Sequence, residues 1–263
     1  MKTKKKLIII SLFLLVAFVL VTLSFLYSKY IDKENNLILL KNDDKEQSIY
    51  ILGTIHEYHF KKILGYSYLD IKNVMDNLDP DLILLEVEQE VFDKFGVIKS
   101  PIEMVPLWCY AVEKGIPVKG VDWFNFSENS RSWTTDQERD DNIFNNVVKS
   151  IDDESRVLII LGSVHRIEQT KRFKNLGYKQ KNVKDKENLF ENNENSEFAY
   201  PKNTVAEVEK QIDYWKSEAL NRVYDQITKN SKGQKYWIKH YDNLVKKLDE
   251  LLEKVFIPDE LFY

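Results

Sequence analysis

The sequence predicts an α/β fold with a central, mostly parallel sheet flanked by helices, an N-terminal transmembrane helix and a C-terminal helical segment. Short apolar runs recur through the middle of the chain, and segments with apolar residues at helical spacing separate them. Continuous apolar runs are typical of strands buried on both faces, as in parallel sheets. Their alternation with helical segments therefore favours a layered α/β domain.

The N-terminus carries a candidate membrane anchor. Residues 7–27 contain no charged side chain and follow the lysines at positions 2, 4, 5 and 6. A run of this length can cross a bilayer as a helix, and the lysines keep the N-terminus in the cytoplasm. A cleaved signal peptide is the alternative, but bulky residues stand where a cleavage site needs small ones. We expect residues 1–28 to form a basic cytoplasmic tip and a single-pass signal anchor, with the globular domain outside the cytoplasmic membrane.

Residues that interrupt helices and strands, together with apolar runs, mark the secondary-structure elements that follow a linker at 29–36. A charged turn joins strands at 37–40 and 48–52, and Asp79-Pro80-Asp81 ends a helix that begins near Tyr68. Pro101 opens a helix that Gly115 closes, as proline and glycine commonly do. We expect strands at 82–86, 116–122 and 158–162, helices at 136–151 and 165–174, and a short last strand after Gly177.

Two regions lie outside this predicted domain, which spans residues 37–184. Residues 185–203 are rich in Asn, Lys and Glu and are expected to form an exposed loop. Residues 204–263 form the C-terminal helical segment, expected to pack on the domain, and their acid–base pairs at helical spacing indicate a solvated face. His240 lies there among aromatic residues, which favours a packing role.

Charge and cysteine content exclude several classes of function. The chain has 38 basic and 42 acidic residues, and without the four N-terminal lysines its net charge is −8. Binding to nucleic acid is not expected, because it needs clustered Lys and Arg. The single cysteine, Cys109, excludes an intramolecular disulfide and thiolate zinc sites. A metal ion must therefore be held by His, Asp and Glu.

Two segments of the chain are nearly alike, and each places a histidine three residues after a glycine that ends an apolar strand. They are Gly53-Thr54-Ile55-His56 and Gly162-Ser163-Val164-His165. Ligand sites in open α/β folds lie at the carboxyl ends of parallel strands. Glu86 and Asp122 also end apolar runs. We therefore expect His56, Glu86, Asp122 and His165 to meet at one edge of the sheet.

This set of side chains suits a divalent metal ion such as Mn, Co, Zn or Fe. His56, His165 and Glu86 are the candidate ligands, and His59 joins them if its segment is helical. Candidate catalytic residues are Glu86 as general base, Asp122, which alternatively caps a helix, and Arg166, which alternatively forms a plain salt bridge. Glu88 is expected to be solvated. A serine or cysteine nucleophile and a phosphate-binding loop are not indicated, because no Gly-x-Ser-x-Gly elbow or glycine-rich motif is present.

The motifs Leu52–His56, Pro80–Glu86 and Leu161–His165 resemble those of the TraB/TIKI group, part of a wider superfamily with erythromycin esterases and ChaN haem-binding proteins. The resemblance covers roughly residues 49–184. It implies an α/β fold with an active site built on both motif histidines, His56 and His165, and on the motif acid, Glu86. TIKI members are divalent-metal-dependent proteases, and TraB members are linked to the inhibition of peptide pheromones. The family often has an Asp-Arg pair where this chain has Asp122-Trp123; Arg131 and Arg139 are candidates to replace that arginine.

The leading hypothesis is a membrane-anchored, extracytoplasmic metal-dependent hydrolase, with a peptide or protein as substrate. Two alternatives remain open. The same cleft in a non-enzymatic protein would bind a peptide or a haem-like ligand, and a degenerate domain would serve as a scaffold that contacts a partner through its C-terminal helices.

Overall fold

The computed structural model describes residues 15–16, 18–19, 33–42, 44–60, 65–124, 137–151, 155–191, 199–229 and 231–256. The predicted anchor at 7–27 lies outside these residues, apart from 15–16 and 18–19, which are helical. Within the described ranges, no helix is both long and apolar enough to cross a membrane.

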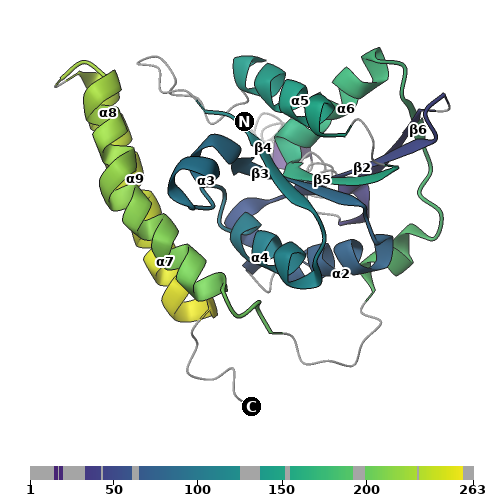
Figure 1. Cartoon of the computed structure of the whole chain (residues 1–263), viewed down its shortest axis with the longest axis horizontal. Helices are drawn as coiled ribbons and strands as arrows, with labels where there is room; N and C mark the ends of the chain where they lie inside the picture. The colour runs from purple at the N-terminus through teal and green to yellow at the C-terminus, as the bar shows by residue number, and fades with distance from the viewer. Residues whose placement is uncertain are drawn as a thin grey trace, which may run out of the picture.

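A six-stranded mixed sheet forms the centre of the molecule (Figure 1). Its order is β4-β3-β5-β2-β1-β6, and the pairs β4–β3, β3–β5 and β5–β2 are parallel. β1 runs antiparallel to both of its neighbours, β2 and β6. The predicted α/β class and mostly parallel sheet are confirmed. The strands are β1 (Leu37–Asn42), β2 (Gln47–Thr54), β3 (Leu82–Glu88), β4 (Val118–Asp122), β5 (Arg156–Gly162) and β6 (Lys179–Lys181).

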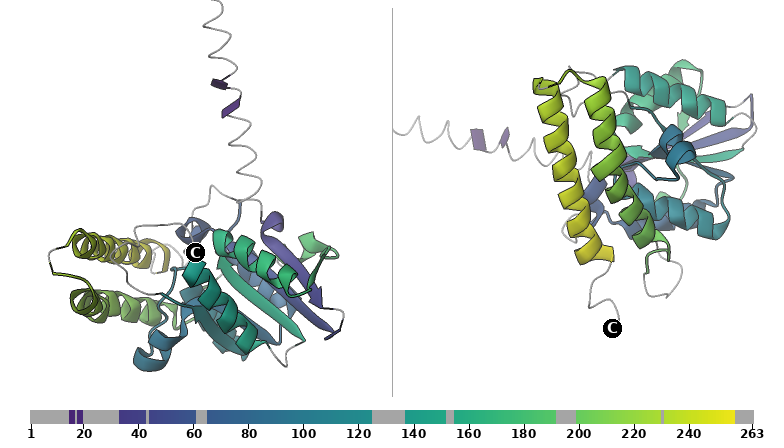
Figure 2. Two further views of the ribbon diagram at one scale, coloured as in Figure 1. Left: turned by 90° about the horizontal axis from the view of Figure 1, so that it is seen from above. Right: turned by 60° about the vertical axis from the view of Figure 1, so that its left-hand side comes forward.

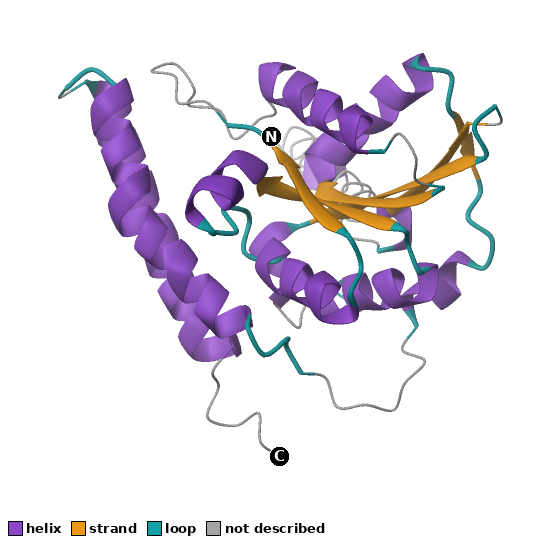
Figure 3. Ribbon diagram, viewed as in Figure 1, coloured by secondary structure: helices purple, strands orange, loops and turns teal. Residues whose placement is uncertain are grey.

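Helices cover both faces of the sheet (Figure 3). On one face, α5 (Gln137–Ser150) and α6 (Ser163–Asn175) close a core with the strands through Ile143, Val147 and Phe173. On the other face, α2 (Tyr68–Leu78) and α4 (Met104–Lys114) belong to a larger core. The central strands β3 and β5 are buried on both sides, which is why their sequences are apolar without alternation.

The C-terminal segment forms a helical hairpin beside this domain (Figure 2). One arm consists of α7 (Thr204–Tyr214), η5 (Trp215–Ala219) and α8 (Leu220–Gln226), and the other of α9 (Lys232–Leu251) and η6 (Leu252–Phe256). Its inner face is aromatic and joins the larger core, in which Trp215, Trp237 and Tyr241 are almost fully buried.

Short elements complete the chain, and one of them corrects an expectation. η1 (Glu34–Asn36) precedes β1, and η2 (His56–Phe60) follows β2. α3 (Gln89–Phe95) begins directly after β3. η4 (Lys186–Phe190) lies within the predicted loop, because Phe190 is buried against the domain.

Candidate functional site

The strand ends bring the two Gly-x-x-His motifs together. β2 and β5 are adjacent and parallel, with Thr54 opposite Gly162, so both motifs leave the sheet at the same edge. His56 begins η2, and His165 lies in the first turn of α6. Glu86 comes from β3, the other neighbour of β5. The sequence therefore predicted correctly which edge of the sheet carries these residues.

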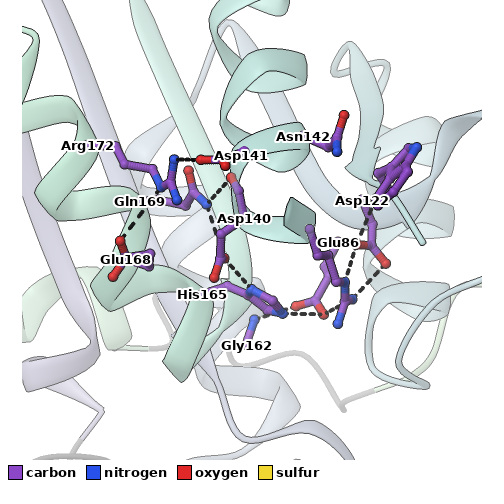
Figure 4. Close-up of polar contacts among 12 residues, drawn as sticks. Glu86, Asp122, Asp140, Asp141, Asn142, Gly162, His165, Glu168, Gln169 and Arg172 are labelled. Carbon is purple, nitrogen blue, oxygen red and sulfur yellow. Dashed lines mark hydrogen bonds and ion pairs between the residues drawn. The ribbon is translucent and has the colours of Figure 1, made fainter. Parts of the chain in front are cut away.

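Glu86 is the centre of the cluster (Figure 4). Its side chain is buried, and its Oε2 accepts a hydrogen bond of 2.6 Å from the backbone N–H of Gly162. Its Oε1 accepts one of 2.9 Å from Arg139 and lies 3.7 Å from Nε2 of His165. Burial opposes the charge, but His165, Arg139 and the Gly162 N–H outweigh it and lower the pKa of Glu86 to about 2.

A buried carboxylate holds the ring of His165. Nδ1 of His165 donates to Oδ1 of Asp140 over 2.7 Å, and Gln169 also donates to Asp140 (Figure 4). Burial disfavours the charged ring, yet Glu86 and Asp140 together raise the pKa of His165 above its ordinary value. With Nδ1 occupied in this way, Nε2 is the ring nitrogen on the side of Glu86.

His56 is held in the same manner. Its Nδ1 donates to Oε1 of Glu103 over 2.9 Å, and the same oxygen accepts a hydrogen bond from Thr54 Oγ1. Burial opposes protonation, but Glu103 and then Glu86 raise the pKa of His56 to about 9. Glu103 is fully buried, and its second oxygen, Oε2, has no hydrogen-bond partner among the residues that the structure describes. No sequence pattern points to Glu103, because it precedes α4 and is 47 residues from His56.

His56 is also the part of the site that faces solvent. Its side chain is 44% exposed, whereas those of Glu86, His165 and Asp140 are at most 7% exposed. Its φ of +54° lies in the left-handed region, which costs energy for a residue other than glycine. The hydrogen bond to Glu103 stabilises this orientation of the ring.

Gly162 allows the ring of His56 and the carboxylate of Glu86 to approach the same point. A Cβ at position 162 would lie 2.9 Å from Cε1 and 3.0 Å from Nε2 of His56, and 3.3 Å from Oε2 of Glu86. No side chain larger than hydrogen fits there without displacement. The glycine of the second motif therefore serves the histidine of the first.

Asp122 enters the cluster through an arginine. Arg139, from α5, donates from Nε and Nη2 to the two carboxylate oxygens of Asp122, each over 2.8 Å, and also to Glu86. Arg139 is thus one of the two arginines that the resemblance left as candidates, placed beside Asp122 by folding. The other, Arg131, lies outside the described residues.

Three other residues named from the sequence lie elsewhere. Both ring nitrogens of His59 bond to backbone, with Nε2 accepting from Ile55 N–H and Nδ1 donating to the carbonyl of Tyr66, so none is left for a metal ion. Arg166 is buried with its side chain packed against Gly53. Glu88 was expected to be solvated. It is instead buried, in an ion pair with Lys99.

The cluster has an excess of negative charge before its histidines are counted. Its ion pairs contain four carboxylates, those of Glu86, Glu103, Asp122 and Asp140, and one guanidinium, that of Arg139, which contacts Glu86 and Asp122. Two imidazolium rings or one divalent cation would offset most of this excess. Among the described residues, no three His, Cys, Asp or Glu side chains are already grouped closely enough to hold a metal ion.

No protein-family model, curated protein or solved structure matches the chain.

Proposed function

We propose that this protein is a membrane-anchored, extracytoplasmic, metal-dependent hydrolase that acts on a peptide. The observation that supports it best is the convergence of two distant histidines on Glu86, each with Nδ1 bonded to a buried carboxylate. Histidines that bind metal ions usually donate their other ring N–H to a carboxylate or carbonyl, which fixes the ring and increases its basicity. Such pairs on both histidines favour a metal site over two unrelated buried rings.

The residues fit a divalent ion in charge and in donor type. Nε2 of His56, Nε2 of His165 and the carboxylate of Glu86 would hold it, and the excess of carboxylates would balance its charge. When bound, such an ion polarises a scissile carbonyl and acidifies water.

The remaining groups keep this arrangement in place. Gly162 N–H and Arg139 donate to the two oxygens of Glu86, which stabilises the anion and favours a role as ligand over that of general base. Asp122 fixes Arg139, and Asp140 and Glu103 fix the two rings. Substrate would approach from the side of His56, where the site is open to solvent.

Elemental analysis of the purified full-length chain tests the metal site. We expect about one equivalent of a divalent ion in the wild type, and its loss in His56→Ala and His165→Ala. His240→Ala, which removes a histidine from the helical hairpin, is the matched control and should keep the ion. A folded wild-type chain that stays free of metal after incubation with Zn²⁺, Mn²⁺, Co²⁺ and Fe²⁺ would refute the proposal.

Hydrolysis is tested separately with a library of fluorogenic peptides. The metal-loaded wild type and His240→Ala should cleave a subset of the library, and both site variants should be inactive. A chain that binds the ion and the peptides but cleaves none of them is a binding protein, and the hydrolase proposal fails.

The anchor is tested by protease treatment of intact cells from which any outer wall has been removed. If residues 7–27 span the membrane with the N-terminus inside, external protease should degrade the globular domain while a cytoplasmic marker survives. Protection of the domain until the membrane is lysed would contradict this orientation.

A further inference from the structure

A basic cavity lies at the opposite end of the sheet from the cluster of His56, His165 and Glu86, which we call the histidine site. Its volume is about 700 Å³, and it lies between strands β1, β2 and β6, the end of α2 and the segment that precedes η4. Arg156, at its wall, is the first residue of β5, whereas Gly162, beside Glu86, is the last. The two sites are thus separated by the length of a strand.

Cationic side chains surround this cavity, although the chain as a whole is acidic. Lys41, Arg156, Lys181 and Lys184 line it, and none of the described residues that line it is Asp or Glu. The backbone N–H of Arg156 donates to Oδ2 of Asp81 over 2.8 Å, so one carboxylate lies beside this arginine. Nζ of Lys184 lies 4.0 Å from Oδ2 of Asp185. Both side chains are largely exposed, so this pair neutralises little of the positive charge.

The register of the sheet explains why these cations lie together. On β1, Lys41 is opposite Ser48 of β2, and Ser48 is in turn opposite Arg156 of β5. β6 pairs with the other edge of β1, where Lys179 is opposite Lys41. Residues directly opposite each other in neighbouring strands project from the same face. Lys41 and Arg156 are thus brought to one face of the sheet, and Lys181, opposite Leu39 on β1, lies on the same face.

Arg156 is held ready at the cavity wall. Its Nη1 donates to the carbonyl oxygens of Leu78 and Asp79, each over 2.9 Å, at the end of α2. These bonds restrict the guanidinium before any ligand arrives, which lowers the entropic cost of binding.

Part of the cavity wall is apolar. Leu39, Leu78 and Leu189 line it together with Tyr50. Lysines on an exposed edge strand often serve only to prevent edge-to-edge pairing, and this reason suffices for Lys179 and Lys181 on β6. It does not account for Arg156, which belongs to an inner strand, or for the apolar lining beneath the cations.

We propose that this cavity binds an anionic amphiphile, that is, a phosphate or carboxylate group on a short apolar body. The anion would contact Arg156, Lys41 and Lys181, and the apolar part would lie against the leucines. This proposal does not depend on the hydrolase proposal, because it uses other residues at the other end of the sheet.

Calorimetric titration of the full-length chain with defined probes tests it. Hexyl phosphate should bind at least tenfold more tightly than inorganic phosphate, which lacks the apolar body, and hexanol, which lacks the charge. Lys41→Gln/Lys181→Gln should weaken the binding of hexyl phosphate at least tenfold. The control, Lys171→Gln/Lys235→Gln, removes the same charge at exposed positions on α6 and α9.

A second pair of probes distinguishes a lipid from a small soluble ligand. Dihexanoyl phosphatidylglycerol below its micellar concentration, compared with dihexanoyl phosphatidylcholine, reports on a lipid headgroup. Preference for the glycerol lipid identifies a lipid source, and binding of hexyl phosphate alone identifies a small soluble anion; both support the site. Equal losses in the two double variants, or no binding of either anionic probe, would overturn it.

Discussion

Gly162 allows the ring of His56 and the carboxylate of Glu86 to come close together. We predict that Gly162→Ala preserves the fold but weakens metal binding at least tenfold. The added methyl group would meet the ring of His56, which is 44% exposed and can turn away into solvent. Because the site would then lose the orientation of one ligand, affinity should fall more than stability. Metal titration by calorimetry and thermal unfolding measure the two effects.

Gly120→Ala is the contrasting variant. There a Cβ would lie 2.4 Å from the carbonyl oxygen of Val87, and a backbone atom in the sheet cannot move aside as an exposed ring can. We expect this variant to lose stability first. If Gly162→Ala instead unfolds as readily as Gly120→Ala while binding metal normally when folded, the close approach at Gly162 serves packing alone.

His59 illustrates a buried histidine with a structural role. Burial lowers its pKa to about 4, against 6.5 for an exposed ring, and the Tyr66 carbonyl and nearby carboxylates only partly oppose this shift. The unfolded chain therefore takes up a proton at a higher pH than the folded chain. Stability should be complete above pH 6.5 and fall as the pH decreases toward 4, by on the order of 3 kcal/mol from this residue.

Urea unfolding at several pH values between 7 and 4 tests this prediction. His59→Gln cannot titrate, so the difference in unfolding free energy between wild type and variant should narrow as the pH decreases. Carboxylates that titrate in the same range affect both proteins alike and cancel in the difference. A difference that stays constant with pH would mean that His59 is not neutral in the fold.

At the scale of elements, two helical segments supply the carboxylates that orient the histidines. Glu103 is the residue directly before α4 and Asp140 belongs to α5, whereas His56 and His165 follow strands β2 and β5. We predict that Glu103→Gln and Asp140→Asn each weaken metal binding roughly 10- to 100-fold, as removal of such partners does elsewhere. Asp141→Asn is the matched control, because Asp141 is next to Asp140 in the sequence but pairs with Arg172 and not with either histidine. Losses of equal size in all three variants would contradict the assigned roles.

The strands were predictable because their signal is local. An apolar run that ends in glycine defines both the strand and the direction in which the following residue leaves the sheet, so His56, Glu86 and His165 could be assigned to one edge. Their partners could not be assigned in this way. Asp140 lies on the buried face of α5 with Ile143 and Val147. It contacts His165, 25 residues away in sequence, only after α5 packs on the sheet.

The wrong prediction that Glu88 is solvated also arose because contacts between elements cannot be seen in the sequence. Glu86 and Glu88 look alike in the sequence, yet Glu86 enters the cluster, whereas Glu88 is buried against Lys99 where β3 passes into α3. The register between β3 and β4 shifts between Leu85 and Glu88, which separates the surroundings of the two acids. A shift of this kind depends on pairing between strands, and no pattern within β3 reveals it.

At the scale of the whole molecule, the hairpin and the domain meet around charged and aromatic side chains. The ammonium of Lys99 lies 5.2 Å from the ring centroid of Phe124 and 5.3 Å from that of Trp215 in the hairpin. Phe124 also contacts Trp237, and Lys247 of α9 pairs with Glu57, next to His56. The hairpin thus contacts the segments that follow both β4 and β2, so its packing supports two borders of the histidine site.

The buried ion pair between Lys99 and Glu88 gives the sharpest test of this interface. Burial lowers the pKa of Lys99 and raises that of Glu88, and each charge opposes the shift in the other. Removal of Lys99 leaves Glu88 buried without its direct partner, with Arg222 4.0 Å away. Lys99→Met should therefore cost about 3 kcal/mol, whereas the paired apolar replacement Lys99→Met/Glu88→Leu should recover most of it. Urea unfolding measures both values. Lys247→Ala, which breaks an ion pair whose lysine is 56% exposed, should change stability by less than about 1 kcal/mol. A double variant no more stable than Lys99→Met would mean that packing of the lysine stem, and not its charge, holds the hairpin to the sheet.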